Sequence, residues 1–413
     1  MKADNISLQG ILNSPNRYLI PVFQRYYSWG RKEWGQLWEN IVELYEGVDD
    51  QPHFMGALVF VPDGYAHHTM PTYLVIDGQQ RLVTLSLLMA ALRNLARSHK
   101  FTTLAGEIND TYLMHPYKTG TEHYRVYPRQ RDRDEYVSVL EHRSYRGTRG
   151  KITDGLIYFV RNIETLLGKD FSEADIRAFF ELIKNQLEFV YITLDEENPY
   201  RIFKSLNSTG MNLSEADLIR NFMLMSVGTD TAAQDAFDDA YWRPLERKFE
   251  DEAGQLNSRE FSIFFRDFLM SNGRYIPLSS TFFHFERRYG GADFQPAALA
   301  LELQNVAQLY NIIRGFEAHA KKDINRALHH LRLLNSSGTY PLVLNLLLRV
   351  QDGTMSTADF VAAVESLRKF VHQLFEGDEA PRMSSLNRWF VQACKALGKK
   401  PLSDLTAYLK AKN

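Results

Sequence analysis

The stretch Tyr73-Leu-Val-Ile-Asp-Gly-Gln-Gln-Arg81, which continues into apolar sequence as far as Ala96, decides the fold of the first half of this chain. Its first four residues are apolar or aromatic and end in a β-branched pair, so they predict a short buried strand. Gly78 then breaks the strand, because glycine accepts backbone angles that other residues avoid. From Gln80 the apolar residues recur on most faces of a helix, which is typical of a buried helix.

Four polar side chains are therefore expected at the N-terminus of that helix: Asp77, Gln79, Gln80 and Arg81. A helix N-terminus carries free N–H groups and a partial positive charge, which together favour phosphate binding. A carboxylate, two amides and a guanidinium also suit the handling of phosphate, metal and water. The alternative is that these residues only cap the helix. Capping, however, needs only one or two of the four. The stretch is not a Walker A loop, which ends in Lys followed by Ser or Thr.

Composition limits the class of protein. With 413 residues, of which 45% are hydrophobic, the chain can bury a large core and is expected to form at least two domains. A net charge of −2 means that any DNA-binding surface must be local. The single cysteine, Cys394, excludes an intramolecular disulfide and a cysteine-based zinc site. Neither a signal peptide nor a membrane-spanning run is evident, so we expect a soluble, cytoplasmic protein without a membrane partner.

A second polar and aromatic cluster lies upstream of the turn, where a strand-like segment beginning at Tyr18 leads into Gln24, Arg25, Tyr27 and Trp29. Arginine beside aromatic faces can stack on a nucleobase, and the guanidinium can also grip phosphate with two hydrogen bonds. The alternative is that the aromatic rings fill the core of the domain. Further downstream, Asn207-Ser-Thr-Gly210 forms a polar loop that is either an Asx-type turn or a set of donors for a ligand.

Residues 112–151 are locally basic and interleaved with tyrosine and histidine. Such a run is usually a solvated, charged excursion. The functional alternative is a surface that contacts the phosphates of DNA. The arginines that we select as DNA-binding candidates are Arg125, Arg129, Arg131 and Arg133.

The remaining periodicity predicts a two-domain α+β protein. Helices are expected over residues 5–13, 31–47, 152–167 and 173–187, and strands over residues 53–60 and 189–194. Gly56 in the strand over residues 53–60 would allow a close backbone approach. Ser214 and Asp217 form a capping box that starts a further helix. We therefore expect an α/β domain over residues 1–225 and a helical bundle over residues 226–413.

Five ordered motifs give the chain a family resemblance: Phe23-Gln-Arg25, Tyr27-Ser-Trp29, Phe54-Met-Gly56, Asp77-Gly-Gln-Gln-Arg81 and Phe203-Lys-Ser-Leu-Asn-Ser-Thr-Gly210. The chain resembles the N-terminal domain of GmrSD-type modification-dependent restriction endonucleases and of related phage-defence proteins such as the phosphorothioate-sensing SspE. The likeness covers most of residues 5–225. The helical half also resembles the middle region of that family through Tyr340-Pro341, Glu365 to Arg368 and Leu386-Asn387.

The resemblance implies a ParB/sulfiredoxin-like N-terminal domain that binds and hydrolyses nucleoside triphosphates with Mg²⁺. It implies catalytic roles for Asp77, Gln79, Gln80 and Arg81, with Asp77 also as the metal ligand. The residues expected to bind the nucleotide are Gln24, Arg25, Tyr27, Trp29, Gly78, Lys204, Asn207 and Gly210.

The function expected from this resemblance is a nucleotide-hydrolysing sensor of modified phage DNA in an antiphage restriction system. The alternatives are a ParB-like, nucleotide-switched DNA-binding protein that does not hydrolyse the nucleotide, and a ParB-like nuclease. Family members that cut DNA continue into an HNH domain, whose metal site is not found in this sequence. The expected partner is therefore an HNH nuclease domain or a separate nuclease subunit, and the chain is either a fragment or a stand-alone sensor. A further copy of this chain, as in a homo-oligomer, is an alternative partner, and the sequence does not determine the base preference, the DNA modification or the oligomeric state.

Overall fold

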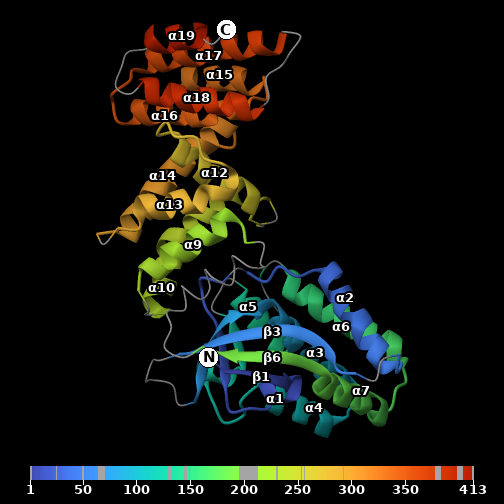
Figure 1. Ribbon diagram of the computed structural model, residues 1–413. Helices are drawn as coiled ribbons and strands as arrows, with labels where there is room; N and C mark the ends of the chain where they lie inside the picture. The colour runs from blue at the N-terminus through green and yellow to red at the C-terminus, as the bar shows by residue number, and fades with distance from the viewer. Residues whose placement is uncertain are drawn as a thin grey trace. The chain divides into compact units, whose positions relative to one another are not determined.

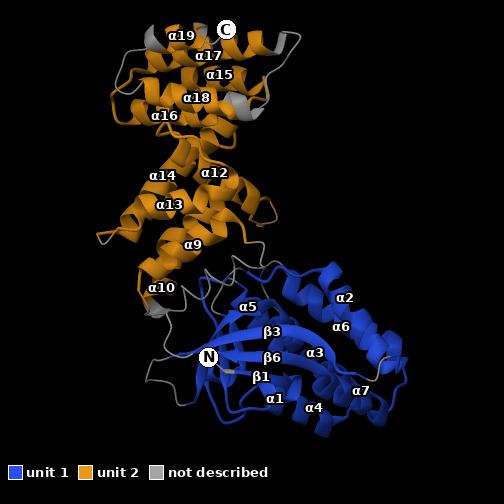
Figure 2. Cartoon of the chain, in the orientation of Figure 1, with its two compact units in different colours: residues 1–211 blue, residues 212–413 orange. Residues whose placement is uncertain are grey.

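The structure is a computed structural model of the chain. It describes residues 2–24, 26–48, 51–63, 70–128, 132–143, 147, 149–194, 213–228, 231–252, 254, 256–291, 293–376, 383–397 and 403–411. The chain divides into two compact units, residues 1–211 and 212–413 (Figure 2).

A mixed six-stranded sheet forms the centre of the first unit (Figure 1). Its strand order is β1-β6-β3-β4-β2-β5. The β1–β6 and β3–β4 pairs are antiparallel, whereas the β6–β3, β4–β2 and β2–β5 pairs are parallel. The strands are β1 (Lys2–Ser7), β2 (Arg17–Ile20), β3 (His53–Pro62), β4 (Thr72–Asp77), β5 (Val126–Pro128) and β6 (Leu187–Thr193).

Helix α3 (Gln79–Ser98) is the central element of the core in this unit. Sixteen of its 20 residues are buried, as its nearly continuous apolar sequence predicts. Each fully buried leucine contributes about 1.5–3 kcal/mol relative to an exposed one, so this helix fixes the position of its own N-terminus firmly. The other helices of the unit are α1 (Leu8–Leu12), α2 (Arg31–Tyr45), α4 (Thr102–Ile108), α5 (Arg133–Leu140), α6 (Lys151–Leu167) and α7 (Glu173–Gln186).

One predicted element is wrong. The helix expected over residues 5–13 is a strand as far as Ser7 and a short helix from Leu8. The physical reason is long-range pairing, because Ile6 lies opposite Phe189 in the antiparallel β1–β6 pair. Ser7 then caps the helix by accepting the N–H of Gly10 at 3.4 Å. This pairing cannot be predicted from the sequence of residues 5–13 alone.

The second unit is helical. Its described residues form no β-strand, only an isolated bridge between Glu250 and Leu256. The capping box at Ser214 is confirmed, since the Asp217 N–H donates to the Ser214 hydroxyl at 3.1 Å and the Ser214 N–H donates to the Asp217 carboxylate at 3.0 Å. The helices are α9 (Glu215–Ser226), α10 (Thr231–Phe237), α11 (Arg243–Glu246), α12 (Ser258–Met270), α13 (Thr281–Tyr289), α14 (Pro296–Arg314), α15 (Lys322–Arg332), α16 (Tyr340–Gln351), α17 (Thr357–Glu376), α18 (Met383–Leu397) and α19 (Ser403–Lys410).

Helix α9 falls within residues 212–413, whereas the sequence pattern places it at the end of the first domain. Throughout the described ranges, no helix combines the length and apolar character needed to cross a membrane.

Candidate functional site

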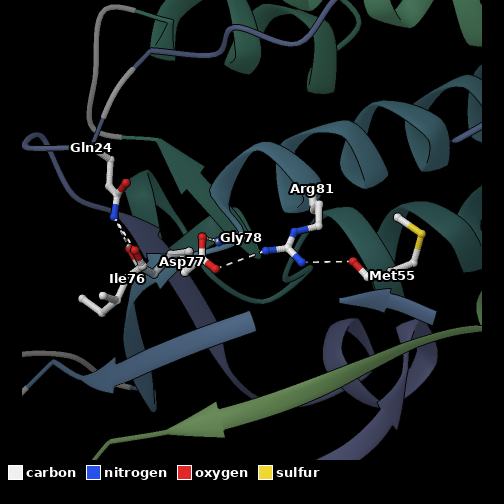
Figure 3. Close-up of polar contacts among 7 residues, drawn as sticks. Gln24, Met55, Ile76, Asp77, Gly78 and Arg81 are labelled. Atoms are coloured by element: carbon white, nitrogen blue, oxygen red, sulfur yellow. Dashed lines mark hydrogen bonds and ion pairs between the residues drawn. The ribbon is translucent and has the colours of Figure 1, made fainter. Parts of the chain in front are cut away.

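The strand–turn–helix predicted at residues 73–81 is present, with β4 ending at Asp77 and α3 beginning at Gln79. Gly78 has a φ of +93°, in the left-handed region, and a Cβ at this position would lie 2.2 Å from the Leu58 side chain. The turn therefore requires glycine both for its backbone angles and for space. The Asp77 carboxylate accepts the Gly78 N–H at 2.8 Å, so the two residues stabilise the turn together (Figure 3).

Arg81 folds back over this turn. Its guanidinium is 3.3 Å from the Asp77 carboxylate, and it also donates to the Met55 carbonyl oxygen on β3 at 3.0 Å (Figure 3). The two charged side chains are about four-fifths buried, with 19% of Arg81 and 20% of Asp77 exposed. Burial lowers the pKa of Arg81, and the neighbouring Asp77 carboxylate opposes that shift. The guanidinium is thus held by one charged and one neutral acceptor at the edge of solvent.

Gly56 makes room for the guanidinium. Its φ is +91°, and a Cβ there would lie only 2.4 Å from Arg81 Nη1. The register of β3 against β6 shifts between Phe54 and Ala57, so Gly56 lies in an irregularity of the strand. The expected close approach at Gly56 is therefore confirmed, and its partner is Arg81.

Gln80 uses both ends of its amide to hold the segment at residues 26–29. Its Oε1 accepts the N–H groups of Ser28 at 2.8 Å and of Trp29 at 3.3 Å. Its Nε2 donates to the Tyr26 carbonyl at 3.1 Å. In this conformation Gln80 positions the segment at residues 26–29.

The Tyr27 side chain lies in the core, with 7% exposed. Its hydroxyl is 2.7 Å from the Thr84 hydroxyl and accepts the Trp34 indole N–H, also at 2.7 Å. Burial raises the pKa of Tyr27 well above its usual value. Trp29 is half-buried and packs against the same core. For Tyr27, the geometry matches the alternative in which the aromatic residues fill the core rather than stack on a base.

Gln79 differs from its neighbours because its amide nitrogen has no partner among the described residues. The side chain is 4% exposed, and its buried Nε2 makes no hydrogen bond in the described part of the chain. It lines a small cavity together with Tyr27, Asp132 and Ile152. Within the described residues, the main-chain N–H groups of Gln79, Gln80 and Arg81 also find no acceptor. A buried polar group without a partner costs about 1–3 kcal/mol, so an acceptor bound here would be stabilised.

Gln24 ties the preceding segment to the end of β4. Its Nε2 donates to the carbonyl oxygens of Val75 at 3.2 Å and Ile76 at 2.8 Å (Figure 3). Gln24 and the end of β4 at the 77–81 turn, distant in sequence, are thus close in space. Other predicted nucleotide contacts, namely Arg25, Lys204, Asn207 and Gly210, lie outside the described residues.

The predicted DNA-binding arginines have different environments. Arg125 is buried, with 8% exposed, and donates to the Ser14 and Asp110 carbonyl oxygens. This geometry favours a structural role over contact with DNA. Arg133 is exposed and paired with Asp134 at 3.3 Å. Arg129 and Arg131 lie outside the described residues.

Two groups that hold parts of the site in place were not predicted from the sequence. The Met55 carbonyl holds Arg81, and a main-chain acceptor leaves no sequence signal beyond the neighbouring Gly56. The Asp132 carboxylate accepts the Tyr27 N–H at 2.5 Å, which joins the start of α5 to the segment at residues 26–29. Asp132 lies within the locally basic residues 112–151, so its place in the sequence did not indicate this contact.

The fold and the site define an α+β domain with a polar strand–helix turn at residues 77–81, followed in the chain by a helical unit. Comparison with known families is consistent with that class. The family model for the GmrSD restriction endonuclease N-terminal domain matches residues 8–224, slightly more than half of the chain. The chain therefore belongs to the GmrSD family, which indicates a role in a restriction system and an interaction with DNA. None of the curated proteins matches the chain.

Proposed function

We propose that this chain binds and hydrolyses nucleoside triphosphates at the 77–81 turn and couples that turnover to recognition of modified phage DNA. We take the first unit to be ParB/sulfiredoxin-like and the DNA-cutting activity to come from an HNH domain or a separate nuclease subunit. One observation carries the proposal. The first turn of the buried helix α3 carries both a guanidinium at the edge of solvent and a buried amide nitrogen that has no partner among the described residues.

The donors at this end suit a polyphosphate. Arg81 offers a planar set of N–H groups that matches phosphate oxygens. The Gln79 amide and the first N–H groups of α3 add neutral donors, and the helix dipole adds partial positive charge. Phosphoryl transfer needs mainly positioning and charge stabilisation from the protein, and donors held in place before the reaction provide both.

Asp77 and Arg81 hold each other in the structure, and a phosphate would compete for the same guanidinium. We infer that substrate phosphate takes the Arg81 guanidinium and releases the Asp77 carboxylate. The released carboxylate can then orient a water molecule. It can also serve as a ligand for Mg²⁺, which typically uses one or two carboxylates together with substrate phosphates and supplies charge neutralisation. Within the described residues, no group of three or more His, Cys, Asp or Glu side chains is arranged to hold a metal.

The other predicted residues receive supporting roles in this proposal. Gln80 and Tyr27 fix the segment at residues 26–29, so they position the site rather than touch the phosphates. Gln24 holds the end of β4. Arg25, Lys204, Asn207 and Gly210 are proposed to complete the nucleotide pocket, as the family resemblance implies.

The test is release of inorganic phosphate from each of the four common triphosphates, with and without modified DNA. Asp77→Asn keeps an oxygen that can accept the Gly78 N–H but removes the charge, so the turn should survive while hydrolysis falls to background. Asp134→Asn is the matched control, because it removes another arginine-paired carboxylate, one that is 75% exposed on α5. Wild-type turnover in Asp77→Asn would refute the assignment.

Nucleotide-binding and plasmid-cleavage assays beside this panel separate the alternatives. Saturable nucleotide binding without phosphate release would support a ParB-like switch instead. Cleavage of plasmid by the purified chain with Mg²⁺ or Mn²⁺, lost in Asp77→Asn, would support a nuclease.

A further inference from the structure

The second unit carries a group of basic side chains without ion-pair partners among the described residues, which we call the basic face. Its members come from the turn after α12, from α13 and from α18. They are Arg274, His284, Arg287, Arg288, Arg388 and Lys395.

Contacts show that these residues lie on adjoining surfaces. His284, Arg287 and Arg288 follow i, i+3, i+4 spacing and so share one face of α13. Burial lowers the pKa of His284, and the positive charges of Arg274 and Arg287 lie close enough to lower it further. Arg288 lies 5.9 Å from the Phe268 ring centroid on α12 and 5.2 Å from that of Tyr289. Helices α12 and α13 also contact each other directly (Figure 1).

The turn after α12 joins α18 to this surface. The Arg388 guanidinium lies 4.9 Å from the ring centroid of Tyr275, the residue after Arg274. A Cβ at Gly273 would lie 2.8 Å from the Lys395 backbone, so the turn packs closely on α18 at that residue. Arg388 and Lys395 are seven residues apart and therefore occupy the same face of α18.

The arginines of the basic face are exposed and form no ion pair within the described residues. Several other arginines of this unit do form ion pairs. Arg243, Arg266, Arg314, Arg326 and Arg368 each pair with a carboxylate. Glu286 of α13 is about 200° around the helix from both His284 and Arg288, so it does not neutralise that face. Phe283, with 58% exposed, adds an apolar ring beside the cationic groups.

We propose that the basic face binds the phosphate backbone of double-stranded DNA. A cluster of exposed arginines that have no ion pair among the described residues, beside an exposed aromatic ring, complements the dense negative charge of a DNA backbone. This surface lies in the helical unit, outside residues 112–151 where the sequence predicts DNA contacts. The DNA-binding proposal does not depend on nucleotide chemistry at the 77–81 turn, because no residue of that turn belongs to the basic face.

Anisotropy of a labelled duplex, titrated with the full chain over a range of salt concentrations, tests the proposal. Each lost phosphate contact should reduce the log–log salt slope by about 0.9 and weaken binding about five-fold at about 0.15 M salt. Arg287→Gln/Arg288→Gln should therefore lower the slope by about 2 and weaken binding about 30-fold. The control Arg243→Gln/Arg326→Gln removes the same charge from paired arginines and should change binding less than about two-fold.

Arg274→Gln/Lys395→Gln provides a second variant, because both side chains are exposed and the fold should tolerate the change. An unchanged salt slope in both basic-face variants, with native circular dichroism, would overturn the proposal. Equal competition by polyglutamate and by unlabelled duplex would also overturn it, since that result would indicate general polyanion binding. Triphosphate hydrolysis without DNA should stay at the wild-type rate in these variants. Failure of this inference is therefore distinguishable from failure of the proposed nucleotide site.

Discussion

Replacement of Gly56 by alanine is expected to move Arg81 without unfolding the first unit. The new Cβ would lie 2.4 Å from Arg81 Nη1, well inside contact distance. Since Nη1 is at the end of a flexible side chain, the guanidinium should move rather than the backbone of β3. That movement would break the hydrogen bond to Met55 and disturb the pair with Asp77.

The size of the effect follows from these contacts. A left-handed φ of +91° costs alanine about 1–2 kcal/mol. Loss of the hydrogen bond from a charged donor adds about 1.5–3 kcal/mol, reduced because Arg81 is partly exposed. Displacement of a preorganised donor from developing charge typically costs about 100-fold or more in turnover. We therefore expect a modest loss of stability and about a 100-fold loss of triphosphate hydrolysis.

Gly47→Ala is the matched control for this prediction. Gly47 also has a positive φ, +68°, but among the described residues no atom beyond its chain neighbours lies within 4 Å of the position that a Cβ would occupy there. Urea denaturation should show backbone strain in both variants, whereas phosphate release should fall only in Gly56→Ala. Equal hydrolysis by the two variants would refute the view that Arg81 must occupy its observed position.

Three further predictions concern stability, each measured by urea denaturation. Gln80→Ala removes the hydrogen bonds that Gln80 makes to the Tyr26 carbonyl and to the N–H groups of residues 28–29, and should cost about 2–4 kcal/mol; a loss below about 0.5 kcal/mol would contradict that role. Burial, with Arg125 contributing, lowers the pKa of His115 to about 4. The unfolded chain therefore binds more protons between pH 6.5 and 4, and stability should fall with falling pH by up to about 1.4 kcal/mol per unit; His115→Leu should lack this component, and an identical pH dependence in the variant would be inconsistent with it. Arg220→Met leaves the buried Asp238 carboxylate unpaired and should destabilise the second unit by about 3–5 kcal/mol; an unchanged midpoint would exclude it.

Much of the fold follows from local signals in the sequence. The strand at residues 73–76, the buried helix after it and the capping box at Ser214 all depend on neighbouring residues, and all are present. Register and strand order are different, because they depend on partners far away in the sequence. Residues 5–7 illustrate this limit, since their pairing with β6 cannot be read from their own pattern.

The strand–helix turn that carries the candidate site was predicted from the sequence, but the contacts of its individual side chains were not. The residue types around Asp77 pointed correctly to one strand–helix turn, because adjacent polar residues between apolar elements have few other places to lie. Which amide is free was not predictable, because Gln79 and Gln80 are chemically identical and differ only in the direction of their side chains. The structure gives Gln80 three main-chain partners, whereas the Gln79 amide nitrogen finds none among the described residues.

The most direct test of the central claim is a crystal structure of the full chain with Mg²⁺ and a non-hydrolysable triphosphate. We predict phosphate density at the N-terminus of α3, in contact with the Arg81 guanidinium and the Gln79 amide, with the Asp77–Arg81 pair opened. Triphosphate density elsewhere in the molecule, with that pair intact and the Gln79 amide still unpaired, would contradict the account.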